Sequence, residues 1–400
     1  MINKKSKELV MHSSCIRQLF EYGKKRKEEI GEDKVYDFSL GNPSVETPSI
    51  VTKKLIDLIK NTDPVKLHGY TSASGDIEVK RKIVENLNKK YNATLKEKYM
   101  YMTCGAAASL TITLNAILND DDEVIIFAPY FPEYRVFIEQ AKGKVIVVNP
   151  LPDTMLPNLN EFEQLINNKT KAIIINSPNN PTGIVYDEEM IKNITTILDN
   201  KQKLFKNNIY IISDEPYREL IYGDIKYPFI TNYYQNSIVC YSFSKSLSLP
   251  GERIGYIVLS SNMKNVDDIY YAICGAGRAL GFVCAPSLFQ KLVSECLDIT
   301  SDLSVYEENK NILYQALISY GYEVIKPEGA FYLFVKALGN SASDFSELAK
   351  KYELLLVPSD SFGYPGFVRI SYCVSKTQII NSLIEFKRLY DDFIKGVNHE

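Results

Sequence analysis

Short runs of apolar, mostly β-branched residues recur through the middle of the chain. They occupy residues 124–127, 145–148, 172–176, 209–212, 238–241 and 256–259. The runs are continuous rather than alternating, which predicts strands buried on both faces, as in a mostly parallel sheet covered by helices. Amphipathic stretches such as residues 160–168 and 187–199 lie between them and predict the covering helices. The pattern therefore predicts an α/β fold.

The pattern changes near residue 290. A long helix-like stretch follows, and then strands are predicted near residues 331–335 and 368–371. Four hundred residues are enough for two unequal domains. We predict that residues 46–285 form a large ligand-binding domain and residues 286–400 a small α+β domain. Residues 1–45 are expected to form an N-terminal arm that joins the small domain in part.

Composition narrows the range of partners. The chain is 45% apolar and 24% charged and carries a net charge of -3, which gives no electrostatic reason to expect nucleic acid or a membrane surface as a partner. No apolar stretch approaches the ~18 residues of a membrane span. We therefore expect an ordinary globular protein that acts on small molecules.

Cysteine and histidine usage adds two expectations. The seven cysteines are scattered and form no CxxC pair, which favours reduced thiols and a cytoplasmic location. The histidines, His12, His68 and His399, show no metal-ligand spacing, so no metal site is expected. His12 and His399, near the termini, are expected on the surface.

A lysine in an unusual setting suggests the chemistry. Lys245 lies shortly after the apolar run at residues 238–241, among Ser242, Ser244 and Ser246, and Arg253 follows eight positions later. A lysine that acts as a nucleophile must be desolvated, positioned and close to an anion site. The serines and the arginine could supply that site. The segment therefore predicts a Schiff-base lysine for pyridoxal phosphate (PLP), with the cofactor phosphate as the anion.

An acidic residue follows another predicted strand, and ligands of parallel sheets bind at the carboxyl ends of strands. Asp214 comes two positions after the run at residues 209–212, before Pro216 and Tyr217. It could cap a helix that begins at the proline. It could instead keep a pyridine nitrogen protonated, with Tyr217 donating to the phenolic oxygen of the ring. A candidate lysine about 30 residues later favours the cofactor interpretation.

Two further loops follow predicted strands. Residues 176–183 hold three asparagines among turn residues, and Asn180 could bond the cofactor ring oxygen and a substrate carboxylate. Phe131 could stack on a flat cofactor or serve as a core or lid aromatic. Both loops would lie at the edge of the sheet that binds ligands.

Small residues open a predicted helix after a short strand at residues 101–102. Gly105, Ala106 and Ala107 would leave backbone N–H groups free for a phosphate, although helix packing would explain the small side chains equally well. The segment lacks GxGxxG spacing and a P-loop lysine, so a dinucleotide or ATP site is disfavoured.

One arginine lies inside an apolar strand of the C-terminal part. Arg369 could point to solvent from an edge strand. If it is buried, a two-pronged clamp for a carboxylate is its natural use, because arginines are rarely buried unless paired. Gly41 could let the backbone approach the same carboxylate or could simply form a turn.

Taken together, these residues resemble the class I/II aminotransferases, the aspartate-aminotransferase-like group of fold-type-I PLP-dependent enzymes. The likeness spans residues 36–371 in the order of the family, with Asn-Asn-Pro-Thr-Gly at 179–183 and Asp-Glu-Pro-Tyr at 214–217. It implies that Lys245 forms the Schiff base, Asp214 pairs with the pyridinium, and Tyr217 and Asn180 bond the ring oxygen. It also implies that Phe131 stacks on the ring and that Arg369 binds the substrate carboxylate. The residues that it implies for phosphate binding are Gly105, Ala106, Ala107, Ser242, Ser244 and Arg253.

The resemblance further implies a homodimer with shared active sites, in which Tyr70 would reach the phosphate of the neighbouring subunit. Family members that use dicarboxylic acids can bring an arginine to the substrate side chain from about residues 275–282. Arg278 could do so, or it could be a surface arginine on a glycine-rich loop. At residues 106–108 this chain has alanines where relatives often carry polar residues, which removes side-chain contacts but keeps backbone ones.

The expected activity is a ping-pong transamination from an L-amino acid to a 2-oxo acid, with aspartate or glutamate as possible substrates. A PLP-dependent lyase, for example a C–S β-lyase, is the alternative, because the same core supports both reactions. A ligand-sensing module of a transcription regulator would need a DNA-binding domain. The residues before Tyr36 are too few and show no basic helix-turn-helix.

Overall fold

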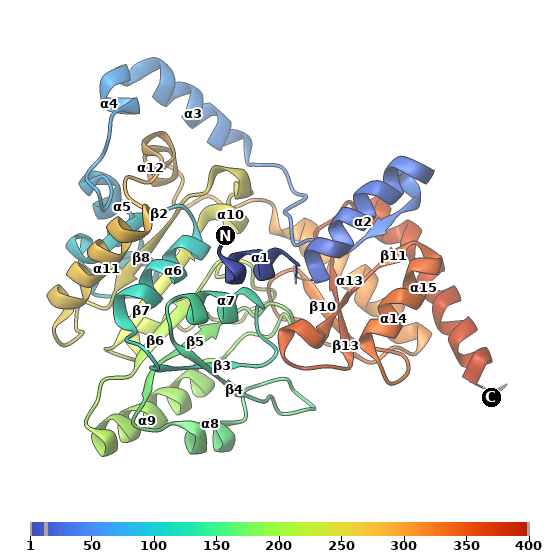
Figure 1. Cartoon of the computed structure of the whole chain (residues 1–400). Coiled ribbons are helices and arrows are strands. Elements are labelled where there is room, and N and C mark those ends of the chain that lie inside the picture. The colour runs from blue at the N-terminus through green and yellow to red at the C-terminus, as the bar shows by residue number, and fades with distance from the viewer. Residues whose placement is uncertain (1, 12–14, 398–400) are drawn as a thin grey trace.

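The fold is known from a computed structural model that describes residues 2–11 and 15–397 (Figure 1). His12 and His399 lie outside the described residues. The largest sheet of the described chain has seven strands in the order β2-β8-β7-β6-β5-β3-β4. Its strands are β2 (Met100–Thr103), β3 (Glu123–Phe127), β4 (Lys144–Val148), β5 (Thr170–Asn176), β6 (Tyr210–Asp214), β7 (Ser237–Ser242) and β8 (Gly255–Leu259).

Each apolar run predicted to be a strand coincides with one of these strands. Strands β3 to β7 pair in parallel, whereas β8 is antiparallel to both of its neighbours, β7 and β2. Consequently β8 alone among the seven runs in the opposite direction. The carboxyl ends of the other six strands meet at one edge of the sheet, where a ligand site is expected.

The sheet is buried on both faces, as the continuous apolar runs predicted. Successive residues of a strand point to opposite faces. Ile125, Ile173 and Ile211 join one apolar cluster, whereas Val124 and Ile174 join another. The α/β fold class predicted from the sequence is confirmed.

Helices cover both faces. The first cluster includes side chains of α5 (Ile77–Tyr91), α8 (Leu159–Leu165) and α9 (Glu188–Phe205), and the second includes those of α6 (Ala106–Ile117), α7 (Glu133–Gln140) and α11 (Val266–Leu280). Helix α9 begins where Asp187 accepts a hydrogen bond from the Met190 N–H at 2.7 Å, a usual N-cap interaction.

One interpretation of the sequence placed the glycine-rich segment at 275–281 in a loop, but the segment is helical. Gly275 and Gly277 lie inside α11, and Gly281 caps the end of the helix with a φ of 78°. A Cβ at Gly277 would overlap the Tyr101 hydroxyl, so close packing of the helix on β2 explains this glycine. Arg278 is therefore a helical residue, and its side chain is exposed.

A smaller sheet lies beside the large one (Figure 1). Its order is β12-β13-β10-β9, and all its pairs are antiparallel. Strand β1 (Tyr36–Asp37) pairs in parallel with β11 (Leu354–Leu355), so the N-terminal part contacts the C-terminal part. The strands of the smaller sheet are β9 (Val324–Ile325), β10 (Tyr332–Lys336), β12 (Val357–Pro358) and β13 (Phe367–Ser371).

The long helix-like stretch expected after residue 290 is two helices, α12 (Ser287–Ser294) and α13 (Leu303–Tyr320). Asp302 accepts a hydrogen bond from the Ser304 N–H at 3.1 Å and so starts the second helix. The remaining helices are α1 (Lys4–Met11), α2 (Cys15–Ile30), α3 (Ser49–Asn61), α4 (Pro64–His68), α10 (Phe243–Ser246), α14 (Ala342–Ala349) and α15 (Lys376–Val397).

Short 3₁₀ turns complete the described chain: η1 (Glu32–Lys34), η2 (Glu97–Tyr99), η3 (Ile230–Asn232), η4 (Pro250–Glu252), η5 (Lys350–Tyr352) and η6 (Ser359–Phe362). Throughout the described ranges, every helix is too short or too polar to cross a lipid bilayer.

Candidate active site

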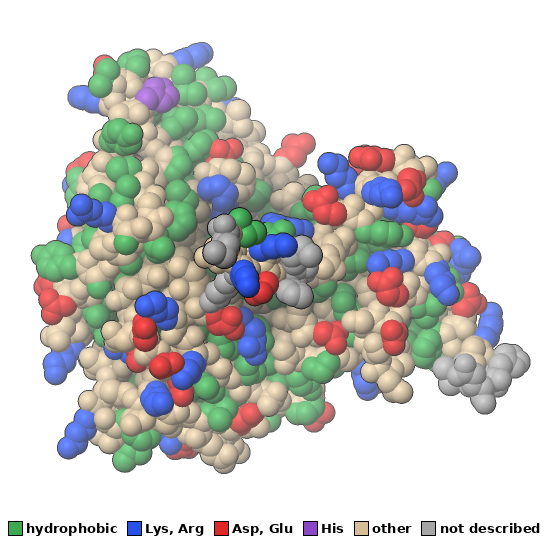
Figure 2. Space-filling view, in the orientation of Figure 1, with side chains coloured by type: hydrophobic (Ala, Val, Ile, Leu, Met, Phe, Trp, Pro, Cys, Tyr) green, Lys and Arg blue, Asp and Glu red, His purple; other side chains and the backbone are tan. Residues whose placement is uncertain are grey.

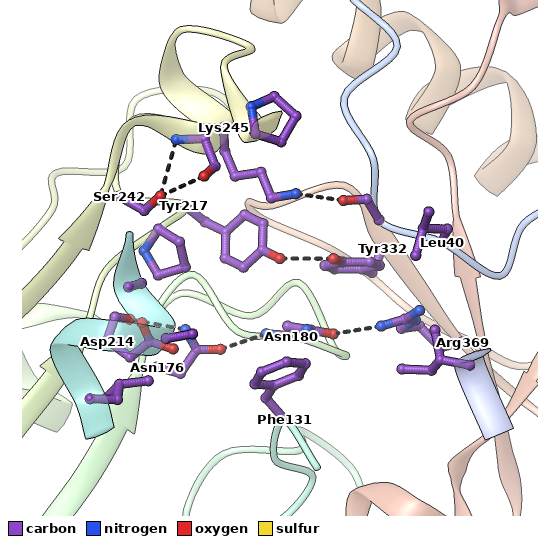
Figure 3. A pocket seen from close by; sticks show the side chains of 18 of the residues that line it. Leu40, Phe131, Asn176, Asn180, Asp214, Tyr217, Ser242, Lys245, Tyr332 and Arg369 are labelled. Carbon is purple, nitrogen blue, oxygen red and sulfur yellow. Dashed lines mark hydrogen bonds between the residues drawn. The ribbon is translucent and has the colours of Figure 1, made fainter. Parts of the chain in front are cut away.

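A pocket of about 280 Å³ lies at the carboxyl ends of β5, β6 and β7, and residues of the smaller sheet close its other side (Figure 3). The structure brings together here most of the residues that the sequence predicted for the site. They are Gly41, Ala106, Ala107, Phe131, Asn180, Asp214, Tyr217, Ser242, Ser244, Lys245, Arg253 and Arg369.

Lys245 projects into this pocket from α10, the short helix that follows β7. Its Nζ donates a hydrogen bond to the Gly41 carbonyl at 2.5 Å and lies 5.2 Å from the centre of the Phe331 ring. Removal of the ammonium from bulk water lowers the pKa of Lys245 to about 8, and the charges of Arg253 and Arg369 act in the same direction. A large fraction of this lysine is therefore a neutral nucleophile at mildly alkaline pH.

Asp214 is the last residue of β6, and its carboxyl is buried. Residues 216–219 form a turn rather than a helix, so the helix-cap interpretation is wrong. Its Oδ2 accepts a hydrogen bond from the Tyr134 hydroxyl at 2.5 Å, whereas Oδ1 has no hydrogen-bond partner among the described residues. Burial raises the pKa of Asp214 to about 7. An unpartnered carboxylate oxygen at a pocket wall suits a cationic N–H, such as a pyridinium.

A cradle for an anion lies next to Lys245. Helix α6 begins after Gly105 without a side-chain cap, so its first backbone N–H groups are free. Arg253 Nη1 donates to Ser244 Oγ at 3.2 Å, and the hydroxyls of Ser242 and Ser244 lie 2.6 Å apart. A helix N-terminus, a guanidinium and two hydroxyls together form a donor set that suits a phosphate.

Gly105 does not line the pocket, but the cradle depends on it. Its φ is 89°, a left-handed conformation that favours glycine, and a Cβ there would lie 2.6 Å from Arg253 Nη2. Gly41 is fixed by a different contact, since a Cβ at that position would overlap the Tyr332 hydroxyl.

Arg369 lies on β13, an inner strand of the smaller sheet, and only 2% of it is exposed. Its Nη1 donates to Asn180 Oδ1 at 3.1 Å and its Nη2 to the Ser39 carbonyl at 2.5 Å. Among the described residues, its Nε has no hydrogen-bond partner, and the two oxygens that accept from its other nitrogens are uncharged. A buried guanidinium without an anion is costly, so the arrangement suits a ligand carboxylate.

Two tyrosines of the site were missed by the sequence reasoning. Tyr332 of β10 lines the pocket, and its hydroxyl lies 2.8 Å from that of Tyr217 and its ring 4.7 Å from the guanidinium carbon of Arg369. Tyr134, which holds Asp214, is three positions after Phe131. That spacing was the only available signal, because residues three apart at the start of a helix share a side.

Phe131 lies at the edge of the pocket below Asn180 (Figure 3). Its ring meets that of Tyr134 edge-on at 5.7 Å between centroids. It also borders a neighbouring cavity of about 610 Å³, together with Arg17 of α2. A ring in this place suits stacking on a flat cofactor.

Two predicted residues lie away from the pocket of this chain. Tyr70 is 98% exposed and lies between α4 and α5, and Arg278 is exposed on α11. No group of three or more potential metal ligands occurs within residues 2–11 and 15–397.

The fold is the fold type I of the aspartate aminotransferases, and the pocket lies between a large and a smaller sheet. The sequence comparison gives the family. The model of the family "Aminotransferase class I and II" matches residues 33–385, and the chain belongs to this family. Its members generally depend on PLP, and the residues of the pocket fit that cofactor.

The matches to individual relatives cover nearly the whole chain. An aspartate aminotransferase of Pyrococcus horikoshii is 32% identical over 94% of both chains, and one of Thermotoga maritima is 31% identical over 92% of this chain and 93% of its own. A crystal structure of an amino transferase from Eubacterium rectale is 48% identical, with a TM-score of 0.95 over 98% of this chain and 99% of the other. The fold class and enzyme class predicted from the sequence are thus confirmed.

Proposed function

We propose that this enzyme uses PLP to move the amino group of an L-amino acid to a 2-oxo acid by a ping-pong mechanism. One observation carries the proposal. A single pocket combines a lysine with a lowered pKa, a carboxylate oxygen and a buried guanidinium. Within the described part of the chain, that oxygen has no hydrogen-bond partner and the guanidinium contacts no anion. Each of these groups matches one part of a PLP-bound amino acid. The relatives give no support to the lyase alternative.

The residues that would hold PLP follow from their chemistry. Asp214 would pair with the ring nitrogen, Tyr217 and Asn180 would bond the ring oxygen, and Phe131 would stack on the ring. The phosphate would be held by the cradle, which comprises Gly105, Ala106, Ala107, Ser242, Ser244 and Arg253. When bound, PLP supplies an electron sink for the electron pair left on the substrate α-carbon.

Lys245 would act first as the covalent tether of the cofactor and then, once the substrate amine has displaced it, as the base. Its Nζ would accept the proton from the substrate α-carbon and deliver it to the imine carbon of the cofactor. Accepting the proton requires the neutral amine that the lowered pKa supplies. The Gly41 carbonyl, 2.5 Å away, gives Nζ a fixed hydrogen-bond partner. Arg369 holds the α-carboxylate and so orients the α-carbon toward Lys245.

We further propose that acidic amino acids are substrates, which the names of the relatives support. Two arginines are candidates for the distal carboxylate. Arg278 is exposed on α11 and could act only on the pocket of a neighbouring subunit. Arg17 lines the cavity beside the pocket of its own chain.

A homodimer with shared sites is proposed from the surface. Apolar side chains gather at the upper left of the molecule, where α3 and α4 lie (Figures 1 and 2). Ile56 and Ile59 of α3 and Val65 of α4 are exposed there, and Tyr70 follows α4 along the chain. A second copy covering this face would bury them and bring Tyr70 to the phosphate of the neighbouring site. A monomer mass in solution would reject this part of the proposal.

Two other expectations remain proposals. Residues 46–285 and 286–400 are proposed as the large and small domains, with residues 1–45 as the arm. The cytoplasm is proposed as the location, since all seven cysteines are free.

A half-reaction tests the activity. The purified enzyme with PLP should be yellow, and an amino donor added without a 2-oxo acid should bleach the visible band once and then stop. A lyase would instead continue and release ammonia. Lys245→Ala should abolish the band, whereas Lys310→Ala, a half-buried lysine of α13, should leave it intact. A wild-type enzyme that never binds PLP would refute the proposal.

A further inference from the structure

The Tyr134 hydroxyl contacts Asp214, the one carboxylate among the described residues that line the pocket. We propose that Tyr134 is a positioning residue: it fixes Oδ2 of Asp214, so that Oδ1 faces the pocket as a carboxylate ready for a cationic ring nitrogen. This inference deepens the proposed function and rests on it.

The geometry leaves Asp214 little choice of orientation. Tyr134 is buried near the N-terminus of α7, and its hydroxyl donates to Oδ2 at 2.5 Å. Oδ1 has no partner among the described residues, and Asp214 lines the pocket. A partial rotation of the carboxylate about its Cβ–Cγ bond would break the short hydrogen bond, and a half-turn would only exchange two equivalent oxygens. The hydrogen bond therefore assigns one oxygen to the protein and the other to the ligand.

The protonation state of the pair follows from its surroundings. Burial holds the pKa of the Tyr134 phenol well above 10, so the phenol donates its proton in a hydrogen bond and does not give it up. Burial raises the pKa of Asp214, whereas the bond from Tyr134 lowers it. Tyr134 thus favours the ionised carboxylate that a pyridinium requires.

Neighbouring groups do not replace Tyr134 in this task. Glu215, the next residue, raises the pKa of Asp214 by its charge. Its own carboxylate instead pairs with Arg218 Nη1 at 3.0 Å and accepts from Ser213 Oγ at 2.8 Å. The Tyr217 hydroxyl is hydrogen-bonded to that of Tyr332. Cys240 of β7 is the strand partner of Asp214 on β6, and burial raises the pKa of its thiol. Among the described side chains, Tyr134 is the one that donates a hydrogen bond to this carboxylate.

The same helix start also supports the proposed stacking ring. Tyr134 meets Phe131 edge-on, and both lie against the apolar cluster on that face of the sheet. Replacement of Tyr134 by phenylalanine keeps the ring in this packing and removes only the hydroxyl. The substitution therefore isolates the hydrogen bond.

The experiment measures PLP affinity and the visible spectrum of Tyr134→Phe, with Tyr234→Phe as the matched control. Tyr234 is also buried, and its hydroxyl donates to the Ile209 carbonyl at 2.8 Å, just before the opposite end of the same strand, β6. We expect Tyr134→Phe to bind PLP about tenfold more weakly, as one lost hydrogen bond to a charged group implies. Its visible band should titrate at a shifted pH and its kcat should fall, with the KM for the amino donor unchanged. Tyr234→Phe should match the wild type in all four readouts.

A double-mutant cycle shows whether the effect passes through Asp214. In an Asp214→Asn background, Tyr134→Phe should change PLP affinity by less than twofold. An equal loss in both backgrounds, or an unchanged affinity and spectrum in Tyr134→Phe, would overturn the inference. Unfolding midpoints of the apo-proteins check that all variants fold. Failure of the wild type to bind PLP would instead refute the proposed function, so the two failures are distinguishable.

Discussion

Replacement of Arg369 by lysine tests the proposed carboxylate site most directly. The substitution keeps the positive charge but removes the planar fork, which has one arm on Asn180 at 3.1 Å and the other on the Ser39 carbonyl at 2.5 Å. A lysine ammonium cannot reproduce both arms and still present two parallel donors to a substrate carboxylate. We expect it to lose one charge-assisted hydrogen bond to the substrate, worth about 1.5–3 kcal/mol. That loss corresponds to a decrease in kcat/KM of about 10- to 150-fold.

The assay is the first half-reaction, followed by absorbance at increasing concentrations of the amino donor. The apparent dissociation constant of the donor should rise, while the affinity for PLP stays within about twofold. Arg388→Lys provides the control, because Arg388 lies on α15 in an exposed pair with Glu385. A variant with unchanged donor affinity, or one that loses PLP and donor to the same degree, would refute the assignment of Arg369 to the substrate.

Three further outcomes are expected. The rate at which the apo-enzyme captures PLP should rise about tenfold per pH unit up to about pH 8 and level off above it, because only the neutral amine of Lys245 attacks. Stopped-flow absorbance measures this rate, and a midpoint of the pH profile near 10.5 would contradict the prediction. Glu215→Ala should lower the free energy of unfolding by about 3 kcal/mol, since it removes a partner of the buried Arg218 guanidinium. Denaturant titration measures this loss, and the control Glu29→Ala, from an exposed pair on α2, should lose about 0–1 kcal/mol. Equal losses in the two variants would count against burial as the cause. If an arginine of the neighbouring subunit binds the distal carboxylate of the substrate, Arg278→Ala should lose activity with acidic donors alone. If an arginine of the same chain binds it, Arg17→Ala should show that loss. Activities measured over a set of amino donors distinguish the two, and unchanged activities in both variants would rule out both arginines.

Much of the large sheet was predictable, because a strand buried on both faces must be apolar along its whole length. Residues 172–176 and 209–212 are such cases, and they became β5 and β6. Strand direction left no comparable mark, so nothing in residues 256–259 showed that β8 runs opposite to its neighbours. The reason for a glycine at position 277 was also hidden, because it is a close contact with Tyr101, far away in sequence.

Site residues were predictable where function demands a rare residue at a strand end. Asp214 and Lys245 stand out in this way, and the structure brings both into one pocket. Their individual roles stay predictions. Tyr134 and Tyr332 did not stand out, since a tyrosine near an apolar segment is ordinary. Their importance appears only when the hydroxyl partners, Asp214 and Tyr217, are known.

The division of the pocket between two sheets has a consequence for the newly made chain. Ribosomes deliver Gly41, Asn180, Asp214 and Lys245 before Arg369, which follows Lys245 by 124 residues. A nascent chain thus possesses the lysine and the aspartate of the cofactor site before it possesses the guanidinium proposed to hold an amino acid. Chains that terminate early, ahead of β13, would consequently carry the cofactor residues without the means to hold a substrate.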